Sequence, residues 1–399
     1  MSPATRLRVF YFLYYGAVGA NLPYFAAYLR GLGFSGEQIG TVLMMGPLVA
    51  APVALTWAAA ADHMGAPSRA LAAATLWSVC VAAFLPVART PLALGAVILV
   101  QALAERAVVP LVDSVALEWT REHPGASYTH IRLFGSLGFI ALAQGLGLML
   151  AARGDRPGDA LVPITVLACV AGYAVAARRL PAPRPTSARP RAREVLALVR
   201  DRRLLALLLA CGVHWTGCAP FHLLFGVFVR DEGLPASVTG LGMAAGVGAE
   251  VLVLLSFPRM EKRLGDRALF ALAFGATALR WVLLSRAHGA GPVIALQLFH
   301  GLTFGLFWAA SMRALSKLVP ATLRATGQAL YAAVVFGGGN AIGYQLAGLG
   351  YDRLGGVRPL FAAAAALEAA LFAATLWFTA RAGNPPRGSW ISREPPPAR

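Results

Sequence analysis

Stretches of predominantly apolar residues follow one another along the whole chain, and each is long enough to cross about 30 Å of hydrocarbon as a helix of about 20 residues. A helix satisfies its own backbone hydrogen bonds, which lipid cannot do, so such stretches cross a membrane as helices. We expect twelve of them, at approximately 9–29, 39–60, 70–87, 92–111, 133–152, 161–177, 204–229, 238–257, 268–285, 293–315, 326–349 and 360–380. The sequence therefore predicts an all-α membrane protein with 12 transmembrane helices.

The composition excludes a water-soluble fold. The chain is 58% hydrophobic and 13% charged, whereas soluble domains are about 45–50% apolar and about 25% charged. In a soluble protein, a net charge of +17 would indicate that the protein binds nucleic acid. In a membrane protein, Lys and Arg instead mark the segments on the cytoplasmic side. If the N-terminus is cytoplasmic, most of the basic residues fall in segments on the cytoplasmic side of the membrane. We therefore expect both termini in the cytoplasm, a bacterial inner-membrane location and no nucleic-acid partner.

The chain is expected to divide into two halves. Residues 178–203 contain nine arginines and several prolines, which predicts a cytoplasmic linker between six-helix bundles at 1–177 and 204–380, followed by a disordered tail at 381–399. Four glycines recur with one constant offset of two hundred residues: Gly33, Gly40, Gly46 and Gly65 match Gly233, Gly240, Gly246 and Gly265. This register predicts duplicated, pseudo-symmetric halves around a central cavity.

Two short polar loops occupy equivalent places in these halves, at 62–69 and 261–267. Parallel six-helix halves are the layout of major facilitator transporters, and both loops resemble the signature loop of that superfamily. The resemblance implies a cytoplasmic gate whose charges hold the halves together in one state. Its residues are Asp62, Gly65, Arg69, Arg263 and Gly265.

Several ionisable or polar side chains fall inside the apolar stretches, where a charge costs about 2.5–3.5 kcal/mol and is a candidate functional group. They are Glu105, Arg106, Asp113, Arg132, Glu250, Arg280, Gln297 and His300. Asp113 and Arg132 flank one loop, so their side chains form either a structural ion pair or the two sides of a substrate site. Gln297, His300 and Thr303 share one helix face, near Arg280 on the preceding helix.

The seventh stretch carries Cys211, His214, Cys218 and His222 at helical spacing. Four ligands from one helix cannot surround a metal ion, and Pro220 breaks the register. We therefore predict no metal and no cofactor. Glu368 in the last stretch and the adjacent Glu105 and Arg106 have no partner that the sequence identifies.

Particular motifs resemble the lactose permease-like branch of the major facilitator superfamily, and bacterial 3-phenylpropionate transporters above all. They are Pro110-Leu111-Val112-Asp113, residues 131–139, Arg280-Trp281, Gln297-Leu298-Phe299-His300, Leu22-Pro23-Tyr24-Phe25 and residues 246–251. The resemblance implies that Asp113 and Arg132 hold the solute, with Phe139 where lactose permease has a stacking Trp. It also implies that His300 binds substrate and that Arg280 assists proton release.

Lactose permease carries its proton on a carboxylate where this chain has Thr303, so any coupling uses another group. Glu250 and Asp113 are the candidates, assisted by Arg280 and His300, because a carboxylic acid in a low-dielectric cavity cycles readily between protonation states. The substrate-binding set is Asn21, Asp113, Arg132, Phe139, Glu250, Gln297 and His300.

The expected function is secondary active transport rather than catalysis: proton-coupled uptake of a small organic solute such as an aromatic monocarboxylate, by alternating access. Its partners would be the solute, protons and the lipid bilayer, and the protein would act as a monomer. Three alternatives stay open at this point. They are a sugar or nucleoside proton symporter, an efflux antiporter or facilitator, and, from another class, a membrane sensor.

Overall fold

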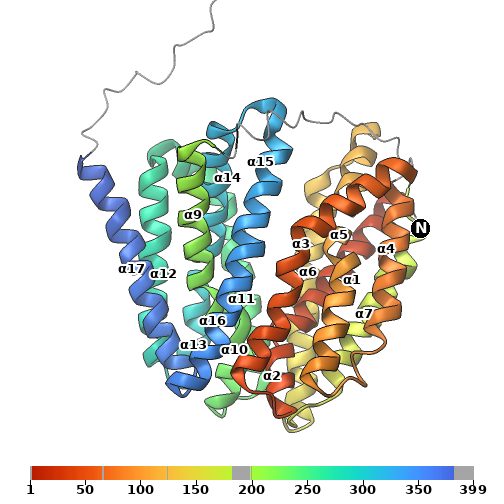
Figure 1. Cartoon of the computed structure of the whole chain (residues 1–399), viewed down its shortest axis with the longest axis horizontal. Coiled ribbons are helices and arrows are strands. Elements are labelled where there is room, and N and C mark those ends of the chain that lie inside the picture. Colours follow the sequence, from red (N-terminus) through yellow and green to blue (C-terminus); the bar gives the residue numbers. More distant parts are fainter. Residues whose placement is uncertain (1, 65–66, 124, 182–197, 199, 382–399) are drawn as a thin grey trace, which may run out of the picture.

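A computed structural model describes residues 2–64, 67–123, 125–181, 198 and 200–381, and these residues form helices and turns without a strand. Gly65, most of the expected linker and nearly all of the expected tail lie outside the described residues. The remaining chain forms two helical bundles that stand side by side, one from each half of the sequence (Figure 1). The predicted all-α major facilitator architecture is confirmed.

The first bundle contains α1 (Pro3–Asn21), α2 (Phe25–Gly31), α3 (Gly36–Met64), α4 (Pro67–Ala82), α5 (Pro91–Glu122), α6 (Tyr128–Ala152) and α7 (Leu161–Ala177). Helix α1 packs on α6 and α7, while α5 packs on α3 and α4. Helices α1 and α2 form one span that breaks at Leu22-Pro23-Tyr24, because proline has no backbone N–H to donate and its ring disrupts the preceding turn.

The second bundle begins with α9 (Arg202–Gly217), α10 (Ala219–Asp231), α11 (Ala236–Arg263), α12 (Asp266–Arg286) and α13 (Ala290–Ala295). It continues through η1 (Leu296–Phe299), η2 (Gly301–Leu306), α14 (Phe307–Leu318), η3 (Ala321–Leu323), α15 (Arg324–Tyr331), η4 (Ala332–Gly338), α16 (Gly339–Leu354) and α17 (Val357–Arg381). The segments η2 and η4 are π-helical, so spans ten and eleven are not regular α-helices.

Helices that join end to end make twelve spans in the described chain. Eight of them are long and apolar enough to cross a membrane on length and composition alone. The other four fall short for different reasons. Helices α4 and α7 have only 16 and 17 residues, and α1–α2 is broken. The span α15–η4–α16 contains Gln328, Asn340, Gln345 and several glycines, which lower its mean hydropathy.

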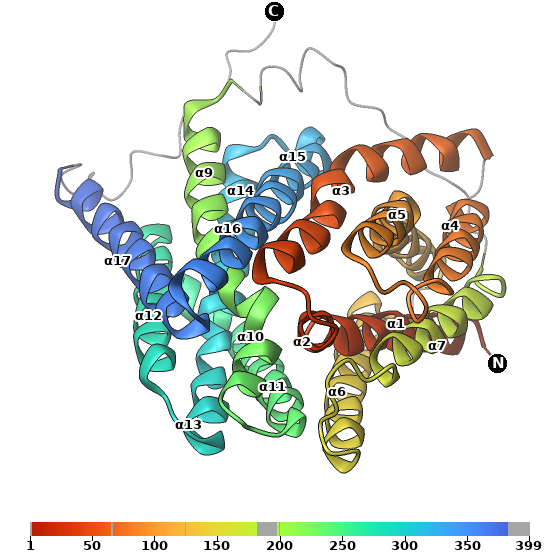
Figure 2. The same cartoon turned by 60° about the horizontal axis from the view of Figure 1, so that its bottom comes forward.

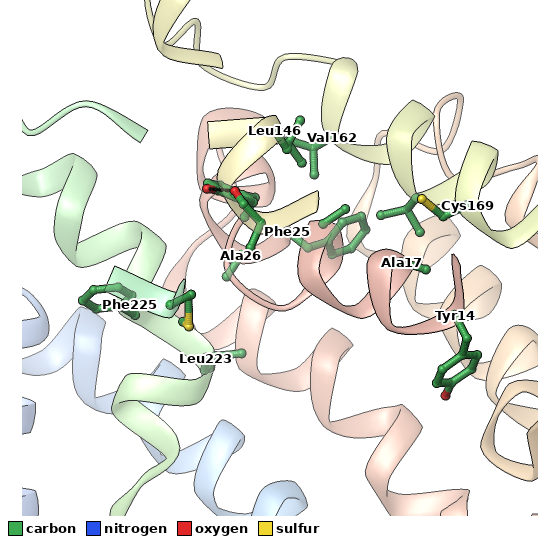
Figure 3. Close-up of a cluster of buried hydrophobic side chains, with 14 of the residues drawn as sticks. Tyr14, Ala17, Phe25, Ala26, Leu146, Val162, Cys169, Leu223 and Phe225 are labelled. Atoms are coloured by element: carbon green, nitrogen blue, oxygen red, sulfur yellow. Dashed lines mark hydrogen bonds between the residues drawn. The ribbon is translucent and has the colours of Figure 1, made fainter. Parts of the chain in front are cut away.

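The bundles converge at one end, which we call the closed end, and separate toward the other, where α1 begins and α17 ends (Figure 1). Between the bundles, α3 packs against α16 and α6 against α11, as the turned view also shows (Figure 2). The hydrophobic core crosses the same junction. Figure 3 shows Phe25 and Ala26 of α2 on one side and Leu223 and Phe225 of α10 on the other.

The two packing contacts at the closed end are related by the glycine repeat. A Cβ atom on Gly40 would lie 2.5 Å from the backbone oxygen of Tyr344, and one on Gly240 would lie 2.6 Å from that of Ala143. Only glycine permits so close an approach of two backbones. The offset read from the sequence therefore marks equivalent contacts, α3 with α16 and α11 with α6, in two pseudo-symmetric halves.

Carboxylates also cross between elements at the closed end. Asp352 at the end of α16 accepts hydrogen bonds from the backbone N–H groups of Gly36 and Glu37, both at 2.8 Å. Asp155, after α6, accepts from the N–H of Ala236 at 3.2 Å. In each case the carboxylate of one bundle accepts from backbone N–H groups at the start of a helix in the other bundle, α3 or α11. These N–H groups have no partner within their own helix, and the helix dipole there favours negative charge.

Candidate functional site

Arg280 of α12 is the centre of a polar cluster inside the second bundle. Its guanidinium donates to Gln297 Oε1 at 2.5 Å and to Thr303 Oγ1 at 2.9 Å, and it lies 3.5 Å from His300 Nδ1. The side chains expected to share a helix face do meet at Arg280. They do so from a 3₁₀ turn and a π-helix rather than a regular α-helix, and Arg280 is only 1% exposed.

Glu250 of α11 faces this cluster. Its carboxylate lies 4.0 Å from His300 Nε2, and both side chains remain partly exposed. Two glycines allow the approach: a Cβ on Gly246 would lie 3.2 Å from the Cβ of His300, and one on Gly305 would lie 3.2 Å from Glu250 Cγ. Gly246 is a member of the glycine repeat. Its missing side chain lets His300 approach α11, and so brings His300 close to Glu250, the candidate proton carrier.

Asp113 and Arg132 do not form a direct ion pair among the described residues. Asp113 instead accepts a hydrogen bond from Tyr11 at 2.5 Å, and Arg132 donates one to the hydroxyl of Tyr15. The guanidinium also lies over the rings of Tyr15 and Tyr11, at 3.9 and 5.4 Å. Tyrosines of α1 therefore separate the two charges, and Arg132 lies within electrostatic range of Glu250 from the opposite bundle.

A cavity of about 310 Å³ lies between α1, α3, α5 and α7 of the first bundle and α10 and α16 of the second. The described residues that line it do not include Asp113, Arg132, Phe139, Glu250, Gln297 or His300. Asn21 lines it, as do Glu105 and Arg106, which sequence reasoning left out of the site. The signal that could have found them is Gln101, one helical turn before Glu105, which adds a third polar side chain to the α5 wall. Phe139 is half-buried, and its backbone oxygen packs against Gly19 of α1.

Glu368 finds its partner in His214, whose Nδ1 lies 2.9 Å from the carboxylate, with both side chains fully buried. The other ring nitrogen lies 3.3 Å from the backbone oxygen of Thr303 and 3.7 Å from Cys218 Sγ. The potential ligand atoms of His214, Cys218 and Glu368 lie within 4.8 Å of one another. Because Glu368 and Cys218 approach opposite edges of the ring, no single ring nitrogen faces both, so the contacts are those of a hydrogen-bonded pair.

The expected gate loops are only partly described. The side chain of Asp62 and all of Gly65 lie outside the described residues, and Arg69 and Arg263 are exposed. Gly265 precedes α12 as its N-cap. In the second loop Asp266 binds Arg313 at 3.1 Å and Lys317 at 2.7 Å, so its charge is neutralised within its own bundle.

The described chain has two pseudo-symmetric helical bundles, charged side chains inside the bundles and a cavity between them. These features define a multi-pass membrane transporter of the major facilitator type. Residues 4–363 match the MFS_1 like family, and the chain belongs to that family. It is 28% identical to the maltose permease of Geobacillus stearothermophilus, over 84% of this chain and 83% of the relative. It is 27% identical to the probable 3-phenylpropionic acid transporter of Escherichia coli, over 86% and 90%.

Solved structures agree on the fold. The nucleoside transporter NupG superposes with a TM-score of 0.82 at 17% identity, covering 95% of this chain and 99% of that one. These relatives and structural neighbours are transporters and not enzymes.

Proposed function

We propose that the chain is a proton-coupled symporter that takes up a small organic acid by alternating access across a bacterial inner membrane. The bundles 1–177 and 204–380 would move as two bodies joined by the linker. With both termini cytoplasmic, as the distribution of basic residues favours, the separated end faces the cytoplasm. The structure then corresponds to the inward-facing state.

The balance of charge inside the spans is the observation that carries this proposal. Apart from the His214–Glu368 pair, the candidate site and the cavity together contain three arginines and three carboxylic acids: Arg106, Arg132 and Arg280, with Glu105, Asp113 and Glu250. Uncompensated charge in a low-dielectric interior is costly. A proton on Glu250 leaves one positive charge in excess, and a bound monoanion restores neutrality. Proton and organic acid therefore favour each other's binding.

Glu250 is the carrier that the contacts favour. Asp113 accepts a hydrogen bond of 2.5 Å from Tyr11 and Glu105 accepts one of 2.9 Å from Tyr14, so both carboxylates already have a protein donor. Glu250 has no hydrogen bond among the described residues, and only His300 approaches it, at 4.0 Å. Of the three carboxylic acids it is therefore the one that the protein binds least tightly.

A neutral sugar or nucleoside is the second candidate substrate, supported by the similarity to the maltose permease and to the fold of NupG. The charge balance separates the candidates, because a neutral solute leaves the protonated site with an excess positive charge. A symporter of neutral solutes would then need one further negative charge in the site to balance the bound proton.

Accumulation in proteoliposomes tests the proposal. Wild-type protein is expected to concentrate 3-phenylpropionate when the proton gradient is directed inward. Glu250→Gln should lose this accumulation but keep exchange of substrate across the membrane. Glu261→Gln, on the same helix but outside the site, is the matched control. Accumulation by Glu250→Gln at the wild-type level would exclude Glu250 as the carrier, and gradient-independent transport by the wild type would exclude symport.

A further inference from the structure

The cavity between the two bundles contains a guanidinium that the protein itself leaves largely unpaired. Arg106 is the one Arg or Lys among the described residues that line the cavity, and its side chain is 40% exposed. In the described chain its only polar contact is with the neighbouring Glu105, at 3.6 Å from Nε. The two terminal nitrogens, which recognise carboxylates in a bidentate manner, have no hydrogen bond there.

The backbone of α3 makes room for this side chain. A Cβ atom on Gly46 would lie 2.5 Å from Arg106 Nη2, so the guanidinium lies directly across a helix surface that only glycine leaves open. Gly46 is the repeat counterpart of Gly246, which admits His300 in the second bundle. The two halves therefore use one repeat position to seat a basic side chain at the interior surface.

The other two interior arginines are less suited to hold a solute. Arg280 is 1% exposed and already donates to Gln297 and Thr303. Arg132 donates to Tyr15 and is covered by tyrosine rings. A ligand that binds either one must displace a protein partner, whereas a ligand that binds Arg106 displaces only water.

Glu105 positions Arg106 at the wall of the cavity. Tyr14 donates to its Oε1 at 2.9 Å, and the other oxygen faces Arg106 Nε. This arrangement holds Arg106 by one edge and leaves its outer edge toward the cavity. Glu105 is in this sense a positioning residue.

The remaining lining combines aliphatic side chains, which we call the aliphatic wall, with amide-bearing ones. Ala17, Leu43, Ile98, Val166 and Val170 provide aliphatic surface, and Asn21, Gln101 and Asn340 provide hydrogen-bonding groups. A cavity of about 310 Å³ with one free guanidinium and a long aliphatic wall suits an organic acid with a compact hydrophobic tail.

We propose that Arg106 binds the carboxylate of the transported solute and that the aliphatic wall of the cavity seats its tail. The proposal rests on the proposed function for the class of solute. It moves the anchor of the solute from Arg132, which the family resemblance implies, to a residue two helical turns before Asp113 on α5.

Equilibrium binding to the full-length protein in lipid nanodiscs tests this assignment, with 3-phenylpropionate and its neutral analogue 3-phenylpropanol as probes. Arg106→Gln should weaken binding of the acid by about 10- to 100-fold, the range for hydrogen bonds to a charged group, and leave the alcohol within about twofold. Arg106→Lys should fall between wild type and Arg106→Gln, because it keeps the charge and loses bidentate geometry. Arg353→Gln, exposed at the end of α16, is the control.

A second variant covers the case in which Arg106→Gln fails to fold. Ile98→Phe fills the apolar wall and should weaken acid and alcohol alike. Unchanged binding of the acid by Arg106→Gln, or unchanged binding of both probes by Ile98→Phe, overturns the proposal.

The outcome for the proposed function is separate. If Arg132→Gln abolishes acid binding while Arg106→Gln does not, the anchor is wrong and symport of an organic acid stands. If wild-type protein accumulates a sugar and binds no organic acid, the proposed substrate class fails, and the assignment of Arg106 fails with it.

Discussion

Replacing Asp352 is the most direct way to shift the equilibrium between the state in which the closed end is closed and the state in which it is open. The carboxylate of Asp352 caps α3 of the opposite bundle through two hydrogen bonds of 2.8 Å, and the cap exists only while the closed end stays closed. Replacing an N-cap by alanine costs about 0.5–2 kcal/mol, and the dipole interaction adds a few tenths. Asp352→Ala should therefore shift the equilibrium toward opening of this end by about 5- to 30-fold, which corresponds to about 1–2 kcal/mol.

Spin labels at Arg89 and His288, both exposed and on opposite bundles near the closed end, report this opening as a longer distance in pulsed electron resonance. Asp201→Ala is a matched control. Asp201 caps α9 by accepting from the N–H groups of Arg203 and Leu204, at 2.7 and 3.2 Å, so the same kind of bond is lost within one bundle. Equal distance distributions for wild type and Asp352→Ala, or an equal shift with Asp201→Ala, would refute the reasoning.

Two further predictions concern ion pairs. Glu368→Ala should destabilise the protein by about 3–5 kcal/mol, because His214 loses the buried carboxylate with which it pairs, and Glu368→Gln should cost clearly less. Equal melting temperatures for the two variants would contradict a paired His214. Beyond the end of α10, two hydrogen bonds from Arg358, at 2.7 and 2.5 Å, hold the pKa of Glu232 below its usual range. The unfolded state then binds this proton more readily, so the pair stabilises the fold above the unfolded pKa of about 4.3, and the stabilisation is lost as the pH falls through the lower folded pKa. Melting temperatures of wild type and Arg358→Gln should converge between pH 7 and pH 3; a pH-independent difference would show that the charge of Glu232 contributes nothing.

Hydropathy and glycine spacing predicted the architecture because both report the environment of the backbone. The stretch 161–177 coincides with α7, and Gly40 and Gly240 lie at equivalent contacts between the bundles. Both features follow from local composition and from a repeat that the sequence displays directly.

The contact partners of individual charged side chains were harder to predict from the sequence. Arg280 was expected near His300 because the two lie on consecutive spans, and they meet. Tyr11 and Tyr15, which bind Asp113 and Arg132, lie more than a hundred residues away in α1. Nothing in the apolar sequence of α1 shows which of its tyrosines face the fourth and fifth spans, and the 3₁₀ and π-helical segments have no sequence mark either.

The π-helical segment at Gly301–Leu306 has a consequence for the direction of the side chains around it. Such a segment is an α-helix that accommodates one extra residue, and each residue of an α-helix turns the chain by about 100°. If the segment relaxed to regular α-helix during the transport cycle, the residues on one side of it would rotate by that angle relative to those on the other. His300, at its start, would swing relative to α14, and a shift of one residue in helical register would then alter which groups face the aqueous pathway without any helix having to tilt.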